Sequence, residues 1–381
     1  MMLPGPTPVP PRVLRAMGTP MINHRGVDFS TLFTEVEAGL KDVFQTNNDL
    51  VILPAAGSGG MESAVVNLLS PGDKALFAVM GVFGQRFVDI ATGYRVEPLV
   101  VEAPWGEAVK PEQIQEKLAA DKDHEIKAVF VTHNETSTGV TLDLERVTQV
   151  VQEHPAILVV DAVSSLGAID LKTDAWGIDV VVTGSQKALM VPPGLALVSV
   201  SQRAWEVVRE NGCCSYYWNW EAYRKLTEKK QTPYTPAVTL WFALREALTM
   251  IREEGLKQIF ERHALMAEMV RTGARALGLD LLAGDAVASN TITAVRSPAG
   301  INVKDLRRCL EAVYGVVVAG GQKKLAGEVF RIGHLGYVFP NDIINVLNAL
   351  DLCLLDLGHD HEAGAAVKAA GEVLKRRGKE K

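Results

Sequence analysis

The sequence predicts an α/β protein, with a large doubly wound, mostly parallel sheet domain followed by a smaller C-terminal α+β domain. Three observations support this fold class. Short apolar runs alternate with helical patterns between about residues 50 and 200, the order typical of a mostly parallel sheet covered by helices on both faces. Polar segments follow three of these runs. Beyond residue 255, long helical patterns are interspersed with short strands, as in a smaller α+β unit.

The chain divides into three expected parts: an extended N-terminal arm (1–20), a large domain (21–254) and a small domain (255–381). The arm is rich in proline, which fixes φ and removes a backbone donor, so we expect it to contain neither a helix nor a central strand. Such an arm usually lies across its own domain or across a partner subunit. Gly255 marks the expected boundary between the two domains.

Apolar periodicity places the elements in order. In the large domain, helices are expected at 29–44, after the turn at 54–63, and at 83–92, 111–120, 144–152, 202–210 and 238–253. Strands are expected there at 50–53, 75–79, 95–101, 128–132, 157–160, 180–182 and 195–200. In the small domain, helices are expected at 256–277, 303–313 and 341–355, and strands at 291–295, 316–319 and 329–332.

The composition is that of an ordinary soluble protein. Of 381 residues, 48% are hydrophobic and 22% charged, and the net charge is −6. The sequence contains no basic run other than residues 375–377, so its charge pattern does not favour nucleic acid or an anionic membrane as a partner. The four cysteines lack CxxC spacing, the N-terminus lacks a signal peptide and no apolar run is long enough to span a bilayer. We therefore expect a cytoplasmic protein with reduced thiols.

Lys187 lies in the turn beyond the apolar strand at 180–182, and a second apolar run follows at 195–200. In open α/β sheets, ligands bind at the carboxyl ends of the strands. A lysine held near apolar side chains loses part of its preference for the charged form, so its amine becomes a usable nucleophile for Schiff-base chemistry. The alternative is a surface lysine in a loop between two strands.

Three polar segments follow strands and are expected to meet at one edge of the sheet: 133–139, 161–165 and 184–187. Asp161 directly follows a fully apolar strand, where a carboxylate needs a cation or donors. It either caps the next helix or, together with Lys187, keeps a pyridine nitrogen protonated.

Other candidates depend on their context. The glycine-rich turn at 54–63 opens a helix and is a candidate phosphate cradle, although its spacing is neither that of a Walker loop nor that of a dinucleotide fingerprint. Trp105 either packs in the core or stacks on a flat cofactor. Arg331, in an apolar strand, binds either a substrate carboxylate or a structural partner such as Glu328. The acidic and histidine-rich residues 359–362 are expected to form a solvated linker, with no metal site.

Five motifs stand in order along nearly the whole chain and resemble those of the class V pyridoxal-phosphate aminotransferases, of fold type I. They occupy residues 57–63, 133–139, 160–165, 184–194 and 331–336. The resemblance is to the alanine–glyoxylate and serine–glyoxylate (serine–pyruvate) branch. It implies that the large domain binds pyridoxal phosphate.

The resemblance implies a role for each residue. Lys187 would form the internal aldimine and shuttle a proton between the substrate Cα and the cofactor's C4′, and Asp161 would pair with the pyridinium nitrogen. The other cofactor contacts would be Trp105 and Val163 on the two ring faces, Thr136 at the phenolic oxygen, and Ser58, Gly59, Gly60 and Gln186 at the phosphate. Tyr234 and Thr235 would reach the phosphate from the other subunit of a homodimer. Arg331 would bind the substrate carboxylate, with the backbone near Gly5 closing the site.

The expected reaction is a ping-pong transfer of the amino group from alanine or serine to glyoxylate or pyruvate. A cysteine-desulfurase-like lyase would need a nucleophilic cysteine on a mobile loop, whereas Cys309 and Cys353 have helical periodicity. Transamination of aminoethylphosphonate or another small amine, and a non-catalytic scaffold that keeps the fold, are further alternatives.

Overall fold

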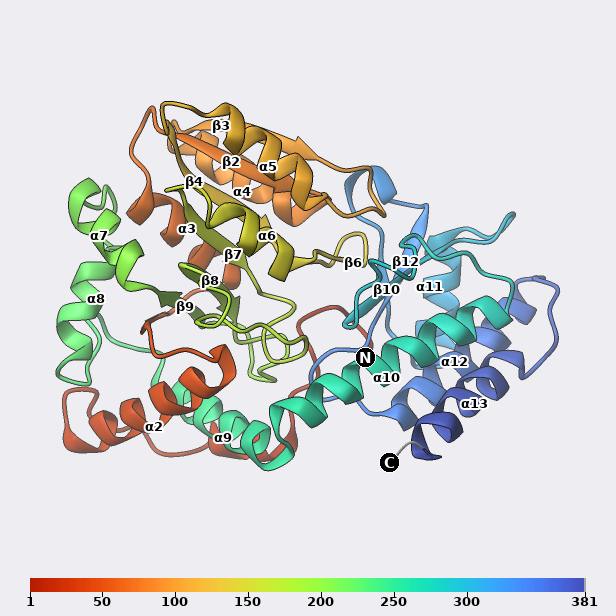
Figure 1. The fold of residues 1–381 in the computed structure, drawn as a ribbon. Helices are drawn as coiled ribbons and strands as arrows, with labels where there is room; N and C mark the ends of the chain where they lie inside the picture. Colours follow the sequence, from red (N-terminus) through yellow and green to blue (C-terminus); the bar gives the residue numbers. More distant parts are fainter. Residues whose placement is uncertain (380–381) are drawn as a thin grey trace.

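A seven-stranded sheet forms the centre of the larger lobe in the computed structural model, which describes residues 1–379 (Figure 1). Its strands are β1 (Asp49–Leu53), β2 (Lys74–Val79), β3 (Glu97–Glu102), β4 (Ile126–Thr132), β7 (Ile157–Asp161), β8 (Val180–Gly184) and β9 (Ala196–Val200). Their order is β1-β9-β8-β7-β4-β2-β3, and only β9 runs against its neighbours. The mostly parallel sheet expected from the sequence is therefore confirmed.

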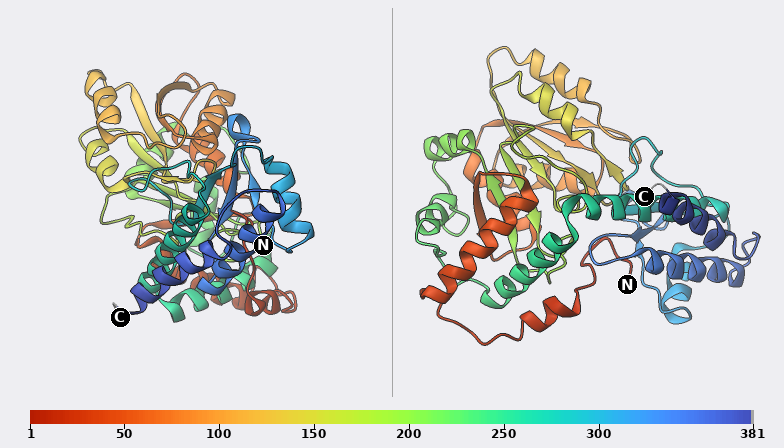
Figure 2. Two further views of the ribbon diagram at one scale, coloured as in Figure 1. Left: turned by 90° about the vertical axis from the view of Figure 1, so that its right-hand side faces the viewer. Right: turned by 60° about the horizontal axis from the view of Figure 1, so that its bottom comes forward.

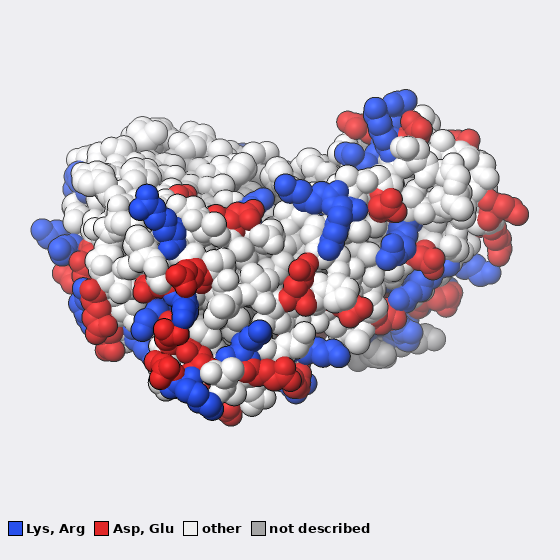
Figure 3. Space-filling view, turned by 90° about the horizontal axis from the view of Figure 1, so that it is seen from above, with Lys and Arg blue, Asp and Glu red and all other residues white. Residues whose placement is uncertain are grey.

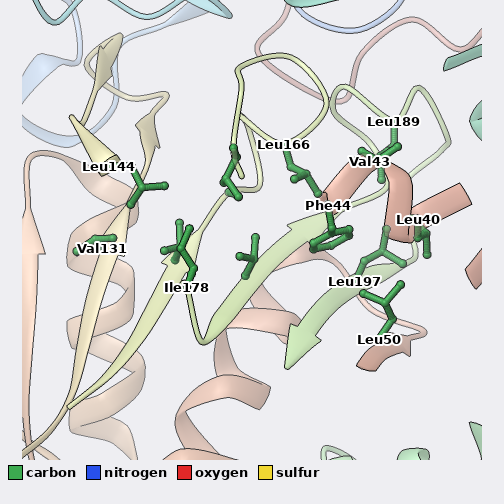
Figure 4. Packing of buried hydrophobic residues seen from close by; sticks show 14 of the residues in the cluster. Leu40, Val43, Phe44, Leu50, Val131, Leu144, Leu166, Ile178, Leu189 and Leu197 are labelled. Carbon is green, nitrogen blue, oxygen red and sulfur yellow. The ribbon is translucent and has the colours of Figure 1, made fainter. Parts of the chain in front are cut away.

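Helices cover both faces of this sheet. The side chains of β2 alternate: Leu76 and Ala78 belong to one core cluster, and Phe77 and Val79 to the other. The first cluster joins the sheet to α2 (Val27–Phe44), α5 (Pro111–Ala120), α6 (Leu144–Val151) and α9 (Val238–Glu254). The second joins it to α3 (Gly57–Leu68), α4 (Val82–Gly93), α7 (Gln202–Asn211) and α8 (Trp220–Thr227). Figure 4 shows part of the first cluster, where Phe44 of α2 packs near Leu197 of β9.

The smaller lobe contains an antiparallel three-stranded sheet, in the order β10 (Ile292–Arg296), β12 (Val329–Gly333), β11 (Ala319–Gly320). Its helices are α10 (Leu256–Ala276), α11 (Val303–Ala312), α12 (Pro340–Asp356) and α13 (Ala365–Lys379), with a 3₁₀ turn η1 (Lys323–Leu325). Helices α9 and α10 run along one side of the molecule from the larger lobe to the smaller (Figures 1 and 2). Gly255, with φ +86°, separates them.

The N-terminal arm differs from the expectation. It contains helix α1 (Pro11–Ala16), so the prediction that 1–20 holds no helix was wrong. Pro11 occupies the start of the helix, where its missing N–H costs no hydrogen bond. At the other end of the arm, Met2 donates its N–H to Val317 O and accepts from Gly333 N, both at 2.8 Å. The strand expected at 316–319 is reduced to β11, because part of it pairs with the arm.

Residues 359–362 also differ from the expected solvated linker. His361 Nε2 lies 3.2 Å from Asp351 Oδ1 and the side chain is only 4% exposed, while His359 Nε2 lies 2.8 Å from Leu277 O. These hydrogen bonds fix the segment against α12 and the end of α10. Within residues 1–379, no group of three or more His, Cys, Asp or Glu side chains is arranged to hold a metal ion.

Charges of both signs are interspersed on the face seen in Figure 3, and the outline is indented between the two lobes. This face offers no continuous basic surface for a nucleic acid. None of the helices among residues 1–379 combines the length and the apolar character needed to cross a membrane.

Candidate active site

The carboxyl ends of three adjacent parallel strands bring the predicted polar segments together. Thr132 at the end of β4 lies opposite Asp161 at the end of β7, which in turn lies opposite Val182 of β8. The segment after β4 forms the short hairpin of β5 (Asn134–Glu135) and β6 (Val140–Thr141). This is the edge at which open α/β sheets bind ligands.

Lys187 follows β8 and lies against the N-terminal arm. Its Nζ donates to Pro4 O, and Thr7 Oγ1 donates to Lys187 O at 2.9 Å. A Cβ at Gly5 would lie 2.5 Å from Lys187 Nζ, and φ at Gly5 is +134°, so the close approach requires glycine. Gly5 therefore lies beside the Lys187 amine, and its expected part in closing the site stays a prediction.

The amine of Lys187 is easier to deprotonate than a solvated lysine. Its pKa is lowered to about 8, mainly by burial, with smaller contributions from the positive charges of Arg331 and Arg86, while the negative charge of Asp161 acts in the opposite direction. A substantial fraction of the amine is therefore neutral at physiological pH, as a nucleophile and base requires.

Asp161 is buried, with only 3% exposed. Its Oδ1 accepts from Val163 N at 2.8 Å in a local turn, and no α-helix follows, so it is not a helix cap. Its pKa is raised to about 7, mainly by burial and also by the charge of Glu135, while the Val163 N–H, Lys187 and Arg86 act in the opposite direction. Within residues 1–379, Oδ2 accepts no hydrogen bond. A cation placed against this carboxylate would restore its charge at neutral pH.

Arg331 of β12 brings the smaller lobe into the site. Its Nε donates to Gly320 O and its Nη1 to Thr136 O, each at 2.8 Å. Burial lowers the pKa of the guanidinium to about 10, against the opposing charge of Glu135. Among the described residues Nη2 has no hydrogen-bond acceptor, and no ion pair joins Arg331 to Glu328. One edge of the fork is free for an anion.

The glycine-rich turn forms the N-terminus of α3. A Cβ on Gly57 would meet Val163 Cγ2 at 2.7 Å, and one on Gly60 would meet Val182 Cγ1 at 2.7 Å. Glycine therefore allows the helix start to pack closely on the sheet. Among the described residues the N–H groups of Gly57 and Ser58 have no acceptor and can bind an anion, whereas those of Gly59 and Gly60 donate to Ala56 O at 2.8 and 3.4 Å. Ser58 lies in the same turn, and its Oγ accepts from Arg86 Nη1 at 2.8 Å.

Three buried polar atoms at these strand ends have no hydrogen-bond partner in the described part of the chain: Thr132 Oγ1, His133 Nδ1 and Gln186 Oε1. Buried polar groups are nearly always hydrogen-bonded, so their clustering around Asp161 and Lys187 indicates a polar ligand. A deprotonatable lysine, a buried carboxylate and a helix N-terminus are the groups that a pyridine aldehyde with a phosphate needs. The residues present thus fit pyridoxal phosphate.

The structure places Trp105 away from these residues, contrary to the expected stacking on the cofactor. It packs in a small core cluster with Leu282, Leu325 and Val329, and Lys324 Nζ lies 4.2 Å from its ring centroid. Phe83, at the start of α4, lies beside Arg86, whose Cζ is 4.6 Å from the centroid of the Phe83 ring. The contacts of Trp105 therefore do not support its expected stacking on the cofactor.

Glu135 fixes the position of Phe83 and is a residue that sequence reasoning did not single out. Its carboxylate accepts from Phe83 N at 2.9 Å, Gly84 N at 3.1 Å and Ser137 Oγ at 2.6 Å. It is fully buried, and burial raises its pKa, while these donors oppose the rise. Its position in the polar segment 133–139 is the sequence feature that could have identified Glu135. No sequence feature pointed to Arg86 or Phe83, because they lie on a helix more than 20 positions from Ser58.

Of the two residues expected to act across subunits, Tyr234 is held within its own chain by aromatic contacts. Tyr234 stacks on Tyr217 with ring centroids 4.8 Å apart, and its hydroxyl donates to Tyr216 O at 2.7 Å. Thr235 is exposed. Within residues 1–379 neither of them is hydrogen-bonded to the α3 turn, so their predicted role depends on a second subunit.

The fold and the site define an aminotransferase that uses pyridoxal phosphate. The sequence pattern of the class-V aminotransferase family matches residues 3–332, and the chain belongs to this family.

Relatives cover nearly the whole chain. It is 43% identical over 376 residues to a protein named soluble hydrogenase small subunit from Synechococcus sp., covering 98% of each chain. It is 38% identical to a serine–glyoxylate aminotransferase from Methylorubrum extorquens, covering 98% of this chain and 95% of the relative. The crystal structure of an alanine–glyoxylate aminotransferase from Nostoc sp. superposes with a TM-score of 0.88 at 32% identity, covering 93% and 94%.

Proposed function

We propose that this chain transfers the amino group of alanine or serine to glyoxylate or pyruvate. The observation that carries the proposal is the convergence of three groups: the deprotonatable amine of Lys187, the buried carboxylate of Asp161 and the free guanidinium edge of Arg331. The serine–glyoxylate and alanine–glyoxylate relatives support the choice of substrates.

The roles of the residues follow from their positions. Bound pyridoxal phosphate supplies an electron sink for the bonds at the substrate Cα. Lys187 would be the base that takes the proton from the substrate Cα and delivers it to the cofactor's C4′. Asp161 keeps a proton on the ring nitrogen, and Arg331 holds the substrate carboxylate so that the Cα–H bond faces Lys187. The arm at Pro4 and Gly5 limits the space beside the amine, which favours a small donor.

The alternatives have less support. A desulfurase needs a mobile nucleophilic cysteine, but Cys353 is fully buried in α12 and Cys309 is part of α11. Two relatives named as hydrogenase subunits are compatible with a scaffold, yet Lys187, Asp161 and Arg331 are all present in this chain. Aminoethylphosphonate remains a chemically reasonable donor, because a guanidinium also binds phosphonates.

We also propose that the protein acts as a homodimer in the cytoplasm. Four cysteines without a disulfide suit a reducing compartment. Tyr216, 84% exposed, and the neighbouring Tyr217 form an aromatic surface next to Tyr234. Burial of this surface against a second subunit would bring Thr235 toward that subunit's phosphate cradle.

A donor and acceptor panel tests the proposed substrates. Alanine, serine, glutamate and aminoethylphosphonate are each assayed with glyoxylate and with pyruvate. We expect the highest kcat/KM for alanine or serine with glyoxylate. A preference for glutamate or for aminoethylphosphonate would reject the proposed substrates but keep the family assignment.

Replacing Arg331 by lysine should weaken the binding of amino-acid substrates. Lysine keeps the charge but loses the planar fork, so we expect kcat/KM for alanine to fall about 10- to 100-fold, mainly through KM. Arg307→Lys is a matched control, because Arg307 Nε also donates to a backbone carbonyl, at 3.0 Å, in the same lobe. An unchanged KM in Arg331→Lys would exclude the carboxylate-binding role.

A further inference from the structure

Arg86 is a cation at the phosphate cradle that the roles assigned so far do not use. It lies on α4, 28 positions from Ser58, and its Nη1 donates to Ser58 Oγ at 2.8 Å. Within residues 1–379 it is the one cationic side chain hydrogen-bonded to the turn at 57–60. Its charge also acts on both Lys187 and Asp161, lowering the pKa of each. Arg86 therefore lies within electrostatic range of the whole site.

The cradle itself lacks a full positive charge. Ser58, Gly59, Gly60 and Gln186 are neutral, and a helix N-terminus provides only about half an elementary charge. A phosphate monoester carries close to two negative charges at neutral pH. The space beside Gly60 is filled by Val182, so no side chain from that position could add a cation. The other cations of the site have other proposed roles: the free edge of Arg331 binds the substrate carboxylate, and Lys187, whose Nζ donates to Pro4 O, is the catalytic base.

The guanidinium of Arg86 is positioned by an aromatic ring and forms no ion pair with a carboxylate of the described residues. It lies 4.6 Å from the centroid of the Phe83 ring, three positions earlier on the same helix. Phe83 is in turn fixed by the hydrogen bond from its N–H to Glu135. No carboxylate among the described residues forms an ion pair with Arg86, so most of its N–H donors remain available. A planar fork with free donors beside a helix N-terminus suits a phosphate.

We propose that Arg86 binds the phosphate of pyridoxal phosphate as its principal counter-ion. Ser58 and Arg86 then form one clamp from two helices of the same chain, and the Phe83 ring positions the guanidinium. This inference rests on the proposed placement of the phosphate at the start of α3. If Arg86 has this role, a single subunit contributes to binding the cofactor's phosphate, and binding does not depend only on residues of a second subunit.

Comparison of pyridoxal phosphate with pyridoxal isolates the phosphate contact, because both carry the same aldehyde and ring. Dissociation constants for the two ligands are measured with the cofactor-free wild type and with Arg86→Met and Arg86→Lys. Arg245→Met is the matched control, since Arg245 also lies over a phenylalanine three positions earlier on a helix, Phe242 at 5.6 Å, but far from the cradle in sequence and on the opposite face of the sheet. Circular dichroism checks that each cofactor-free variant is folded.

We expect Arg86→Met to weaken pyridoxal phosphate binding about 10- to 100-fold and to change pyridoxal binding less than about twofold. Arg86→Lys should recover part of the loss, and Arg245→Met should match the wild type. The ³¹P chemical shift of the bound cofactor should be independent of pH between 5 and 8 in the wild type and should titrate in Arg86→Met, whose phosphate has lost its counter-ion.

The outcomes separate this inference from the proposals on which it rests. If the wild type prefers pyridoxal phosphate and Arg86→Met keeps the whole preference, Arg86 is not the counter-ion. Equal weakening of both ligands in Arg86→Met would also overturn the inference, because it would show a general packing role. A wild type that binds the two ligands equally would instead reject the phosphate cradle at α3.

Discussion

Replacement of Lys187 by alanine is expected to lower kcat for transamination by at least about 10³-fold. Among the described residues, Lys187 is the lysine whose pKa is lowered, to about 8, and whose charge interacts with the buried carboxylate of Asp161. Alanine leaves the phosphate cradle and Arg331 intact. Substrates can therefore still bind, but the proton on the substrate Cα has no base.

The measurement is steady-state kcat with the best donor and acceptor pair, together with a binding titration of pyridoxal phosphate. Lys230→Ala serves as a control, since Lys230 pairs with Glu37 at 2.6 Å on α2 and takes no part in the site. If Lys187→Ala retains more than a tenth of wild-type kcat, Lys187 is not the catalytic base. In that case the scaffold alternative regains support.

Asp161→Asn is expected to lower kcat by about 10²- to 10³-fold, the usual loss when one preorganised electrostatic group is removed from an active site. Asparagine has nearly the same shape, and its Oδ1 can still accept from Val163 N. It cannot, however, stabilise a proton on the ring nitrogen. The fall in kcat therefore measures the contribution of the negative charge of Asp161 and not that of its packing.

The pH dependence of cofactor binding provides a second test of Asp161. Burial raises the pKa of this carboxyl group to about 7 in the chain without its cofactor, so the negative charge is present above pH 7 and is lost as the pH falls through 7. A bound pyridinium favours the charged form. Wild-type affinity for pyridoxal phosphate should therefore decrease below pH 7, and Asp161→Asn should lack this decrease. The same pH dependence in both proteins would assign it to another group.

The main architecture could be predicted from the sequence because it depends on local patterns. Apolar runs and helical periodicity located the strands, and parallel strands must place their carboxyl ends at one edge. Asp161 and Lys187 were therefore identified before their distance in space was known. The helix α1 was missed because proline was counted only as a helix breaker, although the first turn of a helix tolerates it.

The contacts that sequence reasoning missed join residues distant along the chain. Pro4 and Lys187 are 183 positions apart, and Ser58 and Arg86 are 28 apart. The spacing of apolar residues along the sequence does not predict contacts between residues so far apart. Trp105 was assigned to the cofactor because it is aromatic and follows a strand, but β3 is the edge strand of the sheet, far from β8 in strand order. Phe83 follows β2, and its N–H donates to Glu135 in the polar segment after β4, a contact between residues 52 positions apart.

The half-reaction without an acceptor tests the central claim most directly. The purified protein is loaded with pyridoxal phosphate, and alanine or serine is added while the visible spectrum is recorded and the oxo acid is assayed. The proposed function predicts that the yellow absorbance disappears, that oxo acid forms in an amount equal to that of the enzyme, and that glyoxylate restores the colour. Persistent absorbance with every amino acid tried, and no oxo acid, would contradict an aminotransferase acting through Lys187 and Asp161.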